Sequence, residues 1–272
     1  MNRPVALITG ASAGIGSELA QQFAAAGYDL ILTARRRERL EALAGELQLR
    51  HHCRCEVVVV DLASPNAAVN LVAEVERRGW EVDVLVNNAG FGVNGPFAEA
   101  DPDRLTALMQ VNIVALTELT RLLLPGMIAR GHGRILNVAS IASFMPGPLM
   151  AVYYASKAYV RSLSEALSEE LRNTGVTVTC LCPGPVRTEF ADTAGMAGAK
   201  LFEMPNTMTA EPVAAAALRA TLRGRRLVIP GFLNRLLTIM VAWVPKSALL
   251  RVVMRLQNHR RQPPPESSEP AK

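Results

Sequence analysis

The segment from Val5 to Gly16 reads VALITGASAGIG, and it decides the fold. Val5 to Thr9 form a short, continuous apolar run of the kind that a strand buried on both faces requires. Glycines follow directly in the spacing G-x-x-x-G-x-G, and a helical pattern opens at Gly14. A glycine turn between a strand and a helix lets the backbone approach a pyrophosphate, whose charge meets free N–H groups and the positive helix dipole. The segment therefore predicts a dinucleotide site.

The same alternation of apolar runs and helical stretches continues along the chain. Helices are expected from about Gly14 to Ala26 and up to about Leu49. The further apolar runs are Leu30–Ala34, Glu56–Val60, Val82–Val86, Arg134–Val138, Val176–Leu181 and Leu227–Ile229. Apolar strands separated by helices are typical of a parallel sheet that is covered on both faces. We predict the α/β class, with a doubly wound, Rossmann-type parallel sheet of about seven strands.

Composition gives no sign of a second folded domain. Residues 1–230 contain no Gly/Ser linker, so we expect one Rossmann-type domain there. Residues 231–261 are basic and apolar and predict a helical extension packed on that domain, with helices at about Leu233–Trp243 and Ser247–Arg260 on either side of Pro245. Residues 262–272 are rich in Pro and Ser without an apolar period, which predicts a disordered tail.

Charge and cysteine usage exclude several classes of protein. The formal net charge is +5, but no acidic residue lies between Pro212 and Pro265. Such a local basic region indicates a solvated rim or a local anionic partner, and not a nucleic-acid-binding protein. The cysteines form two C-x-C pairs without a second ligand cluster at zinc spacing, so we expect no metal site. Met1 runs almost directly into an apolar strand with no leader-like segment, and we expect a cytoplasmic protein.

The end of the second expected strand indicates which dinucleotide binds. It reads Thr33-Ala34-Arg35-Arg36-Arg37, without the carboxylate that would bond the ribose hydroxyls of NAD. Arg35 and Arg36 can hold the 2′-phosphate of NADP as planar, charge-assisted donors. An ordinary basic helix start explains Arg37, which has Glu41 four residues later. We predict NADP(H) in preference to NAD(H), although Ala13 offers the phosphate no second contact.

Polar residues follow two other expected strands. Asp61 and Leu62 end the third strand, where a carboxylate can accept from the adenine amino group, and Asn88-Ala89-Gly90 follow the fourth at the same sheet edge. Turn chemistry alone also explains these residue types, because Asp, Asn and Gly all favour strand ends.

A tyrosine and a lysine are placed for acid–base chemistry. Tyr153 and Lys157 lie on one face of an expected long helix, and Ser140 ends an earlier strand. A phenol has a pKa of about 10 and is a poor acid or base unless a nearby cation stabilises its anion, and Lys157 can be that cation. Tyr154 also lies on the lysine face at spacing i,i+3, although the spacing from Ser140 favours Tyr153.

Together these motifs resemble the classical short-chain dehydrogenase/reductase family. The resemblance spans residues from about 5 to 190 and rests on the glycine turn, Asn87-Asn88-Ala89-Gly90, Ser140, Tyr153-x-x-x-Lys157 and Pro183-Gly184. It implies an enzyme that transfers a hydride between a nicotinamide cofactor and a carbonyl/secondary-alcohol pair. It also implies that Tyr153 is the general acid/base, that Ser140 bonds the substrate oxygen, and that Lys157 also holds the nicotinamide ribose.

The resemblance extends the expected site further. Asn112 matches the position that supports a water beside the lysine, although an Asn in a helix can also bond its own backbone. Pro183, Gly184, Val186 and Thr188 match the segment beside the nicotinamide carboxamide. The full expected cofactor set is Gly10, Ser12, Ala13, Gly14, Ile15, Gly16, Arg35, Arg36, Asp61, Leu62, Asn88, Ala89, Gly90, Tyr153, Lys157, Pro183, Gly184, Val186 and Thr188.

Apolar residues after the last motif suggest the character of the substrate. The stretch from about 189 to 209 is rich in Phe, Met and Leu and predicts a lid over an apolar carbonyl compound. Phe190 in this stretch is expected to form the pocket wall with Phe91, Phe144 and Met145. The same side chains could instead fill the domain core.

Three alternatives concern the extension, and a fourth concerns the activity. The apolar and basic residues of 231–261 fit a cover over the active site, a contact between subunits of a homodimer or homotetramer, or a peripheral contact with an anionic membrane, as in a lipid-type carbonyl reductase. We favour the cover or the subunit contact. A non-catalytic NADP-binding sensor or scaffold would show the same turn, but Ser140, Tyr153 and Lys157 together argue for an enzyme.

Overall fold

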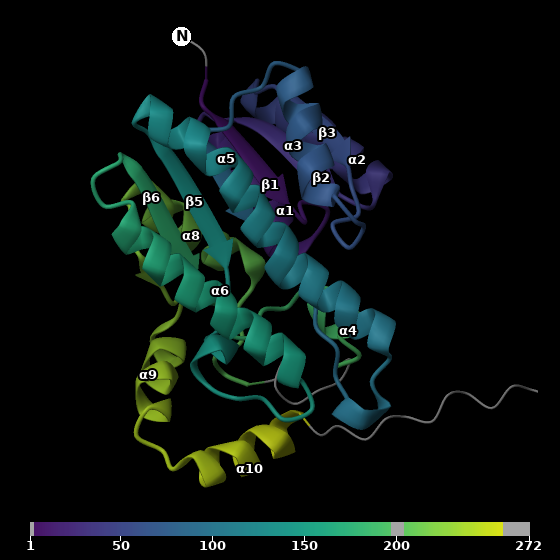
Figure 1. Ribbon diagram of the computed structural model, residues 1–272, viewed down its shortest axis with the longest axis vertical. Coiled ribbons are helices and arrows are strands. Elements are labelled where there is room, and N and C mark those ends of the chain that lie inside the picture. The colour runs from purple at the N-terminus through teal and green to yellow at the C-terminus, as the bar shows by residue number, and fades with distance from the viewer. Residues whose placement is uncertain (1–2, 197–203, 258–272) are drawn as a thin grey trace, which may run out of the picture.

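The computed structural model describes residues 3–196 and 204–257. Its centre is a seven-stranded parallel sheet in the order β3-β2-β1-β4-β5-β6-β7 (Figure 1). The strands are β1 (Val5–Thr9), β2 (Asp29–Ala34), β3 (Cys55–Val59), β4 (Val84–Asn87), β5 (Gly133–Val138), β6 (Val176–Leu181) and β7 (Leu227–Val228). Strand order reverses between β1 and β4. This is the topological switch point at which open α/β sheets bind ligands, beyond the carboxyl ends of the strands.

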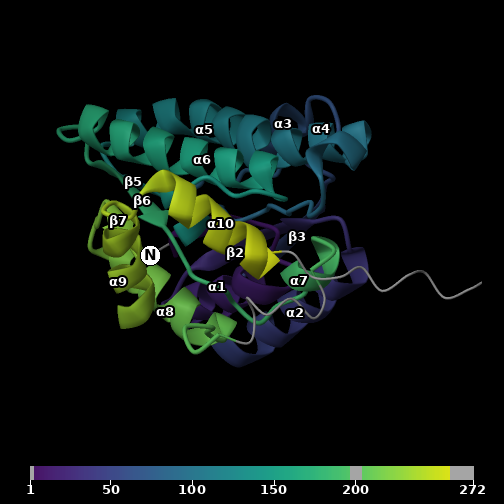
Figure 2. The same cartoon turned by 90° about the horizontal axis from the view of Figure 1, so that it is seen from below.

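Helices cover both faces of the sheet. Figure 2 shows α1, α2 and α8 below it and α3, α4, α5 and α6 above it. These helices are α1 (Gly14–Ala25), α2 (Arg37–His51), α3 (Ala67–Arg77), α4 (Pro102–Met109), α5 (Leu116–Arg130), α6 (Ala151–Glu170) and α8 (Ala210–Leu222). A π-helical segment, η2 (Gln110–Ala115), joins α4 to α5, and short 3-10 turns occur at η1 (Phe97–Glu99) and η3 (Ile141–Phe144).

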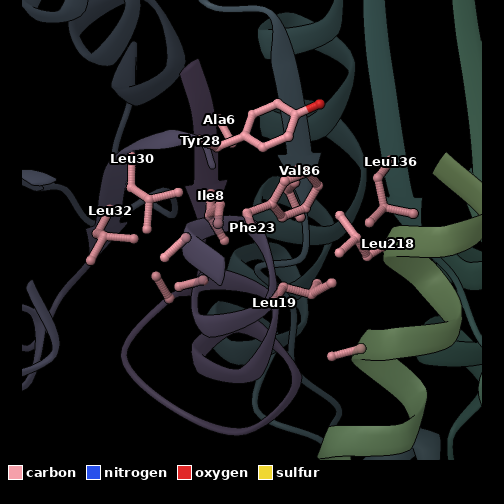
Figure 3. Packing of buried hydrophobic residues seen from close by; sticks show 14 of the residues in the cluster. Ala6, Ile8, Leu19, Phe23, Tyr28, Leu30, Leu32, Val86, Leu136 and Leu218 are labelled. Carbon is pink, nitrogen blue, oxygen red and sulfur yellow. The ribbon is translucent and has the colours of Figure 1, made fainter. Parts of the chain in front are cut away.

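Alternate residues of each central strand enter different cores. Ala6 and Ile8 of β1 pack toward α1 and α8, whereas Val5 and Leu7 pack toward α3 and α5. Figure 3 shows the first core, where Phe23 of α1 lies among strand residues and its ring meets Tyr28 edge-on at 5.1 Å. Both faces of β1 are apolar because both are covered, and this is why its sequence shows no polar alternation.

The longest helical run lies on the upper face. Among the residues that the structure describes, Pro102–Arg130 is the one helix long and apolar enough to cross a membrane by length and composition. Its segments contact α3, α6 and the strands β4 and β5. We therefore interpret the run as a covering helix of the domain. The prediction of the α/β class and of a doubly wound, seven-stranded parallel sheet is confirmed.

Two helices of the extension lie beyond the carboxyl ends of the strands, α9 (Phe232–Val241) and α10 (Lys246–Gln257) (Figures 1 and 2). They are separated at Pro245, as the sequence predicts. Asn234 anchors α9, because its buried amide donates to Pro230 O at 3.0 Å and accepts from Asn206 Nδ2 at 2.7 Å. The proposed tail at 262–272 lies outside the described residues.

Candidate active site

A cavity of about 580 Å³ opens at the carboxyl ends of the strands. The glycine turn after β1, the ends of β2 to β6, helix α6 and the helices α9 and α10 all contribute to its lining. It lies at the switch point between β1 and β4, where this topology places ligands. Most of the predicted site residues line this one cavity: Gly10, Ser12, Ala13, Gly14, Ile15, Arg35, Arg36, Asp61, Leu62, Asn88, Ala89, Gly90, Phe91, Ser140, Met145, Tyr153, Lys157, Pro183, Gly184, Val186, Thr188 and Phe190.

The glycine turn is packed too tightly for side chains. Gly10 has φ +65°, and a Cβ on Gly16 would lie 2.2 Å from the carbonyl oxygen of Gly10. Asn88 holds the turn from the next strand, since its Nδ2 donates to Thr9 O at 2.9 Å. A bare backbone at the N-terminus of α1 is a cradle for a negatively charged group, so the turn fits a dinucleotide pyrophosphate.

An arginine and a serine meet at the adenosine side of the cavity. The guanidinium of Arg36 donates to Ser12 Oγ at 3.2 Å and to Glu189 Oε2 at 2.7 Å. Arg39 also pairs with Glu189, and these hydrogen bonds from Arg39 and Arg36 hold the pKa of Glu189 below its usual value. Arg37 instead pairs with Glu41 at 3.3 Å, as expected for a basic residue at an ordinary helix start. The donors that line the cavity here suit a phosphate.

Asp61 and Leu62 also line the cavity, at the end of β3. The Asp61 carboxylate accepts from Ala63 N at 3.0 Å, so it does serve turn chemistry. Its exposed side chain keeps further acceptor capacity toward the cavity.

Ser140, Tyr153 and Lys157 lie together at the opposite end. Ser140 caps η3: its Oγ accepts from Ala142 N at 3.1 Å and donates to Pro183 O at 3.5 Å. Desolvation raises the pKa of Tyr153 above its usual value, while the neighbouring Ser140 hydroxyl opposes that shift. The two hydroxyls thus face a common position at which a substrate oxygen can be held.

Lys157 supplies the charge beside this pair. Its side chain is 5% exposed, Nζ donates to Val138 O at 2.8 Å, and it lies 5.8 Å from the centroid of the Tyr153 ring. Burial lowers the pKa of Lys157 to about 8. The lysine therefore changes charge close to neutral pH, and its state controls how easily the phenol loses its proton.

Asn112 lies behind the cavity in η2. Its Nδ2 donates to Phe91 O at 3.0 Å and to Ser156 Oγ at 3.1 Å, and its Oδ1 accepts from Phe91 N at 3.1 Å. It therefore joins the loop after β4 to α6 and does not bond its own helix. A Cβ on Gly90 would lie 3.0 Å from Asn112 Oδ1 and 3.3 Å from Lys157 Nζ. The side chains of Asn112 and Lys157 therefore both lie next to the Gly90 backbone.

Tyr154 has a different environment from Tyr153. Its hydroxyl accepts a 2.5 Å hydrogen bond from Gln257 of α10, and burial raises its pKa to about 12. The sequence gives no signal for this pairing, because the partners are 103 residues apart. Tyr154 thus connects α6 to the extension.

The expected substrate wall is partly as predicted. Phe91, Met145 and Phe190 line the cavity, and the Phe190 ring lies 5.3 Å from that of Tyr153. Phe144 does not line the cavity, and the prediction for it is wrong: Arg161 stacks over its ring at 4.1 Å, which turns it toward α6. Helix α7 (Phe190–Thr193) begins the expected lid, whose central residues 197–203 lie outside the described residues.

The extension supplies the remaining wall. The inner sides of α9 and α10 contribute Leu237, Val241, Leu249, Val252, Val253 and Leu256. These residues are aliphatic, and Gln257 at the end of α10 is the polar side chain among the described cavity-lining residues of the two helices, so this side of the cavity is mainly apolar. The interpretation of residues 231–261 as a cover over the active site agrees with this placement.

Comparison with known proteins assigns the family. A family model described as short chain dehydrogenase matches residues 4–199, and the chain belongs to that family. An uncharacterized oxidoreductase of Staphylococcus saprophyticus is 35% identical over 187 residues, which cover 69% of this chain and 80% of that protein. A very-long-chain 3-oxoacyl-CoA reductase of Phaeosphaeria nodorum is 40% identical over 182 residues, 65% of this chain but only 53% of that enzyme.

Solved structures agree in fold. A short-chain dehydrogenase from Sphingobium yanoikuyae in complex with NADPH superposes with a TM-score of 0.79 at 32% identity, covering 95% of this chain and 99% of that one. A bulky-bulky ketone specific alcohol dehydrogenase from Comamonas testosteroni gives a TM-score of 0.76 at 27% identity, with 97% and 100% covered. The fold is thus shared over nearly the whole chain, including the extension.

Proposed function

We propose that the protein is an NADP(H)-dependent oxidoreductase that transfers a hydride between the nicotinamide and a carbonyl or secondary alcohol. The observation that carries the proposal is the joint placement of Ser140, Tyr153 and Lys157 in the cavity that also contains the glycine turn. One end of the cavity suits a pyrophosphate, and the other holds acid–base groups.

The preference for NADP(H) over NAD(H) rests on the adenosine end. Arg35, Arg36 and Ser12 line the cavity there, and Arg36 already donates to Ser12. These donors match a phosphate better than a ribose diol, and no carboxylate stands at the end of β2 to repel the added charge. Two similar proteins of known structure were solved with NADPH bound, one of them together with L-sorbose. Both structures support NADP(H) as the cofactor of this protein.

We assign a separate role in carbonyl reduction to each residue of the site. NADPH, when bound, supplies the hydride that the carbonyl carbon accepts. Ser140 donates a hydrogen bond to the substrate oxygen, and Tyr153 gives that oxygen its proton, so that the carbonyl becomes an alcohol. Protonated Lys157 stabilises the phenolate left on Tyr153. In oxidation Tyr153 takes the proton back, and Asn112 supports this machinery by fixing Phe91 and Ser156 beside it.

The substrate that we propose is an apolar carbonyl compound or alcohol. Methionine and aliphatic side chains surround the catalytic hydroxyls, among them Met145, Met150 and Met196 with the inner residues of α9 and α10. Such a wall binds mainly through apolar surface, and Ser140 and Tyr153 are placed to hydrogen-bond the reacting oxygen.

We further propose a cytoplasmic homo-oligomer, a homodimer or homotetramer. The run α4–η2–α5, with α6, carries exposed apolar side chains suited to a contact with a second copy: Met109, Val114, Leu122, Ile128 and Tyr159. The second candidate function is a carbonyl reductase that works at a membrane surface, and the outward apolar residues of α9 favour it.

The test is a fluorescence titration of the purified protein with NADPH and NADH, followed by a carbonyl screen with the better nucleotide. We expect NADPH to bind more tightly, and Arg35→Ala to remove most of that preference. Arg50→Ala, on the far end of α2, is the matched control and should bind as the wild type does. Binding without turnover of any apolar carbonyl compound would favour the sensor or scaffold instead, and binding of neither nucleotide would reject the site.

A further inference from the structure

Helix α9 carries large apolar side chains on its outer face. Phe232, Leu236 and Ile239 recur at spacings of four and three residues, which places them in one stripe along the helix, and Trp243 follows in the turn after α9 ends at Val241. Phe232 is 81% exposed and Trp243 84%. Leu233, Met240 and Val244 widen this surface, and we call the seven residues the outer stripe.

The orientation of the outer stripe is fixed by the opposite face of α9. Asn234 is buried in its hydrogen bonds with Pro230 and Asn206, and Thr238 is buried one turn later. A Cβ on Gly184 would lie 2.3 Å from Asn234, so α9 sits directly on the segment that follows β6. The helix cannot rotate its stripe inward without breaking these contacts.

The charged side chains of α9 and α10 are all basic. Arg235 lies on α9, and Lys246, Arg251 and Arg255 lie on α10, all exposed. None of these side chains forms an ion pair with another described residue, and no acidic residue occurs in the sequence from Pro212 to Pro265. An apolar helix face among unpaired positive charges matches an interface that offers both hydrocarbon and anionic groups.

We propose that the outer stripe and these basic residues bind the protein to the surface of an anionic lipid bilayer. Trp243 lies at the end of the stripe, and tryptophan favours the level of the lipid headgroups. The four exposed cations of α9 and α10 suit such a surface because each contributes attraction to anionic lipid. The α9 stripe enters the interface, and the arginines of α10 contact headgroups.

A second copy of the chain suits this face less well. A two-fold contact sets the same patch against itself, and here it would bring positive charges together without a carboxylate to compensate them. Residues 258–272 contain no large apolar side chain with which to cover the stripe. The apolar surface on α4, α5 and α6 offers a second copy a separate contact.

The proposed contact with the bilayer also offers a lipophilic substrate a route into the cavity. Leu237 and Val241 line the cavity from the inner side of the helix whose outer side carries the stripe. A lipophilic substrate dissolved in the bilayer would therefore reach the cavity along α9 and α10. This last step rests on the proposed function, whereas binding to the membrane does not.

The experiment is flotation of the full-length protein with vesicles, without nucleotide. Phosphatidylcholine vesicles containing phosphatidylglycerol should carry the protein at low salt, and pure phosphatidylcholine vesicles should carry much less. The double variant Ile239→Ser/Trp243→Ser should lower the partition coefficient by about tenfold or more, because it removes buried apolar area. Arg251→Gln/Arg255→Gln should lower it by about fivefold for each arginine removed.

Matched controls and a second readout keep the outcomes separate. Leu49→Ser removes an equally exposed apolar residue from α2, and Arg77→Gln/Arg172→Gln removes exposed arginines elsewhere; both should float as the wild type does. A blue shift of Trp243 emission on adding anionic vesicles, lost in Trp243→Phe, reports insertion directly. NADPH binding and turnover of a water-soluble carbonyl compound, measured without vesicles, should be unchanged in every variant, so a failed hydride-transfer proposal would be seen separately.

Absence of flotation with anionic vesicles at low salt would overturn the membrane proposal, as would equal flotation of the variants and the wild type. A lower oligomeric mass of the Ile239→Ser/Trp243→Ser variant in light scattering would show that a second copy occupies the stripe instead.

Discussion

Glu189 Oε2 lies 2.7 Å from Arg36 Nη1, so a carboxylate at the start of the expected lid engages an arginine of the adenosine end. The next residue, Phe190, packs against the ring of Tyr153. The two ends of the cavity are thus connected through neighbouring residues of the lid.

This ion pair predicts the effect of Glu189→Gln on nucleotide choice. A 2′-phosphate and the Glu189 carboxylate compete for the same guanidinium, so removing the charge should tighten NADPH binding by about two- to fivefold, the range of an exposed ion pair. NADH, which lacks the phosphate, should bind unchanged. Titration of both nucleotides measures the effect, and Glu41→Gln, which releases only Arg37, is the control. Weaker NADPH binding would mean that Glu189 holds Arg36 in place for the phosphate.

The environments of the neighbouring tyrosines predict opposite phenotypes. Tyr153→Phe removes the hydroxyl that faces Ser140 and should lower kcat by about 10²-fold or more, with the Kd for NADPH within about twofold of the wild type. Tyr154→Phe should keep most of the activity, because its hydroxyl is engaged by Gln257. Steady-state kinetics and nucleotide titration of both variants decide the matter. If the phenotypes were exchanged, Tyr154 would be the acid.

The pKa of Lys157 predicts how reduction depends on pH. Burial lowers this pKa to about 8, so the amine is charged below that pH and neutral above it. The charged form stabilises the Tyr153 phenolate, and the rate of carbonyl reduction should therefore fall as pH rises through about 8. Tyr154→Phe should show the same alkaline limb, since the Tyr154 pKa is about 12. A rate that stays constant up to pH ~10, near the ordinary lysine pKa, would contradict this role.

The tight turn after β1 predicts a loss of binding on a minimal substitution. Gly16→Ala places a methyl group 2.2 Å from Gly10 O and should abolish detectable binding of NADPH and NADH alike. Gly45→Ala in α2 is the matched control, since a Cβ there meets nothing within 4 Å, and it should bind normally with a slightly higher Tm. Calorimetry and thermal unfolding separate lost binding from lost folding. Normal binding by Gly16→Ala would show that the turn is not the cradle.

The parts of the site that sequence could predict are those encoded locally. The strand–turn–helix at Gly10 and the pair Tyr153 and Lys157 each depend on neighbouring residues whose spacing sets their geometry. The partners of Tyr154 and Arg36 could not be found this way, because Gln257 and Glu189 reach them through tertiary folding over 103 and 153 residues. The prediction that Phe144 lines the cavity fails for the same reason, since its ring packs under Arg161 of α6.

The boundary of the family match has a consequence for engineering. The matched region ends at residue 199, whereas the aliphatic wall of the cavity comes from α9 and α10 beyond it. The hydroxyls of Ser140 and Tyr153 and the glycine turn thus lie within the matched region, and much of the apolar wall of the cavity lies beyond it. A chimera that keeps this chain to Pro230 and takes the two following helices from a related reductase should acquire a new substrate range while retaining its nucleotide.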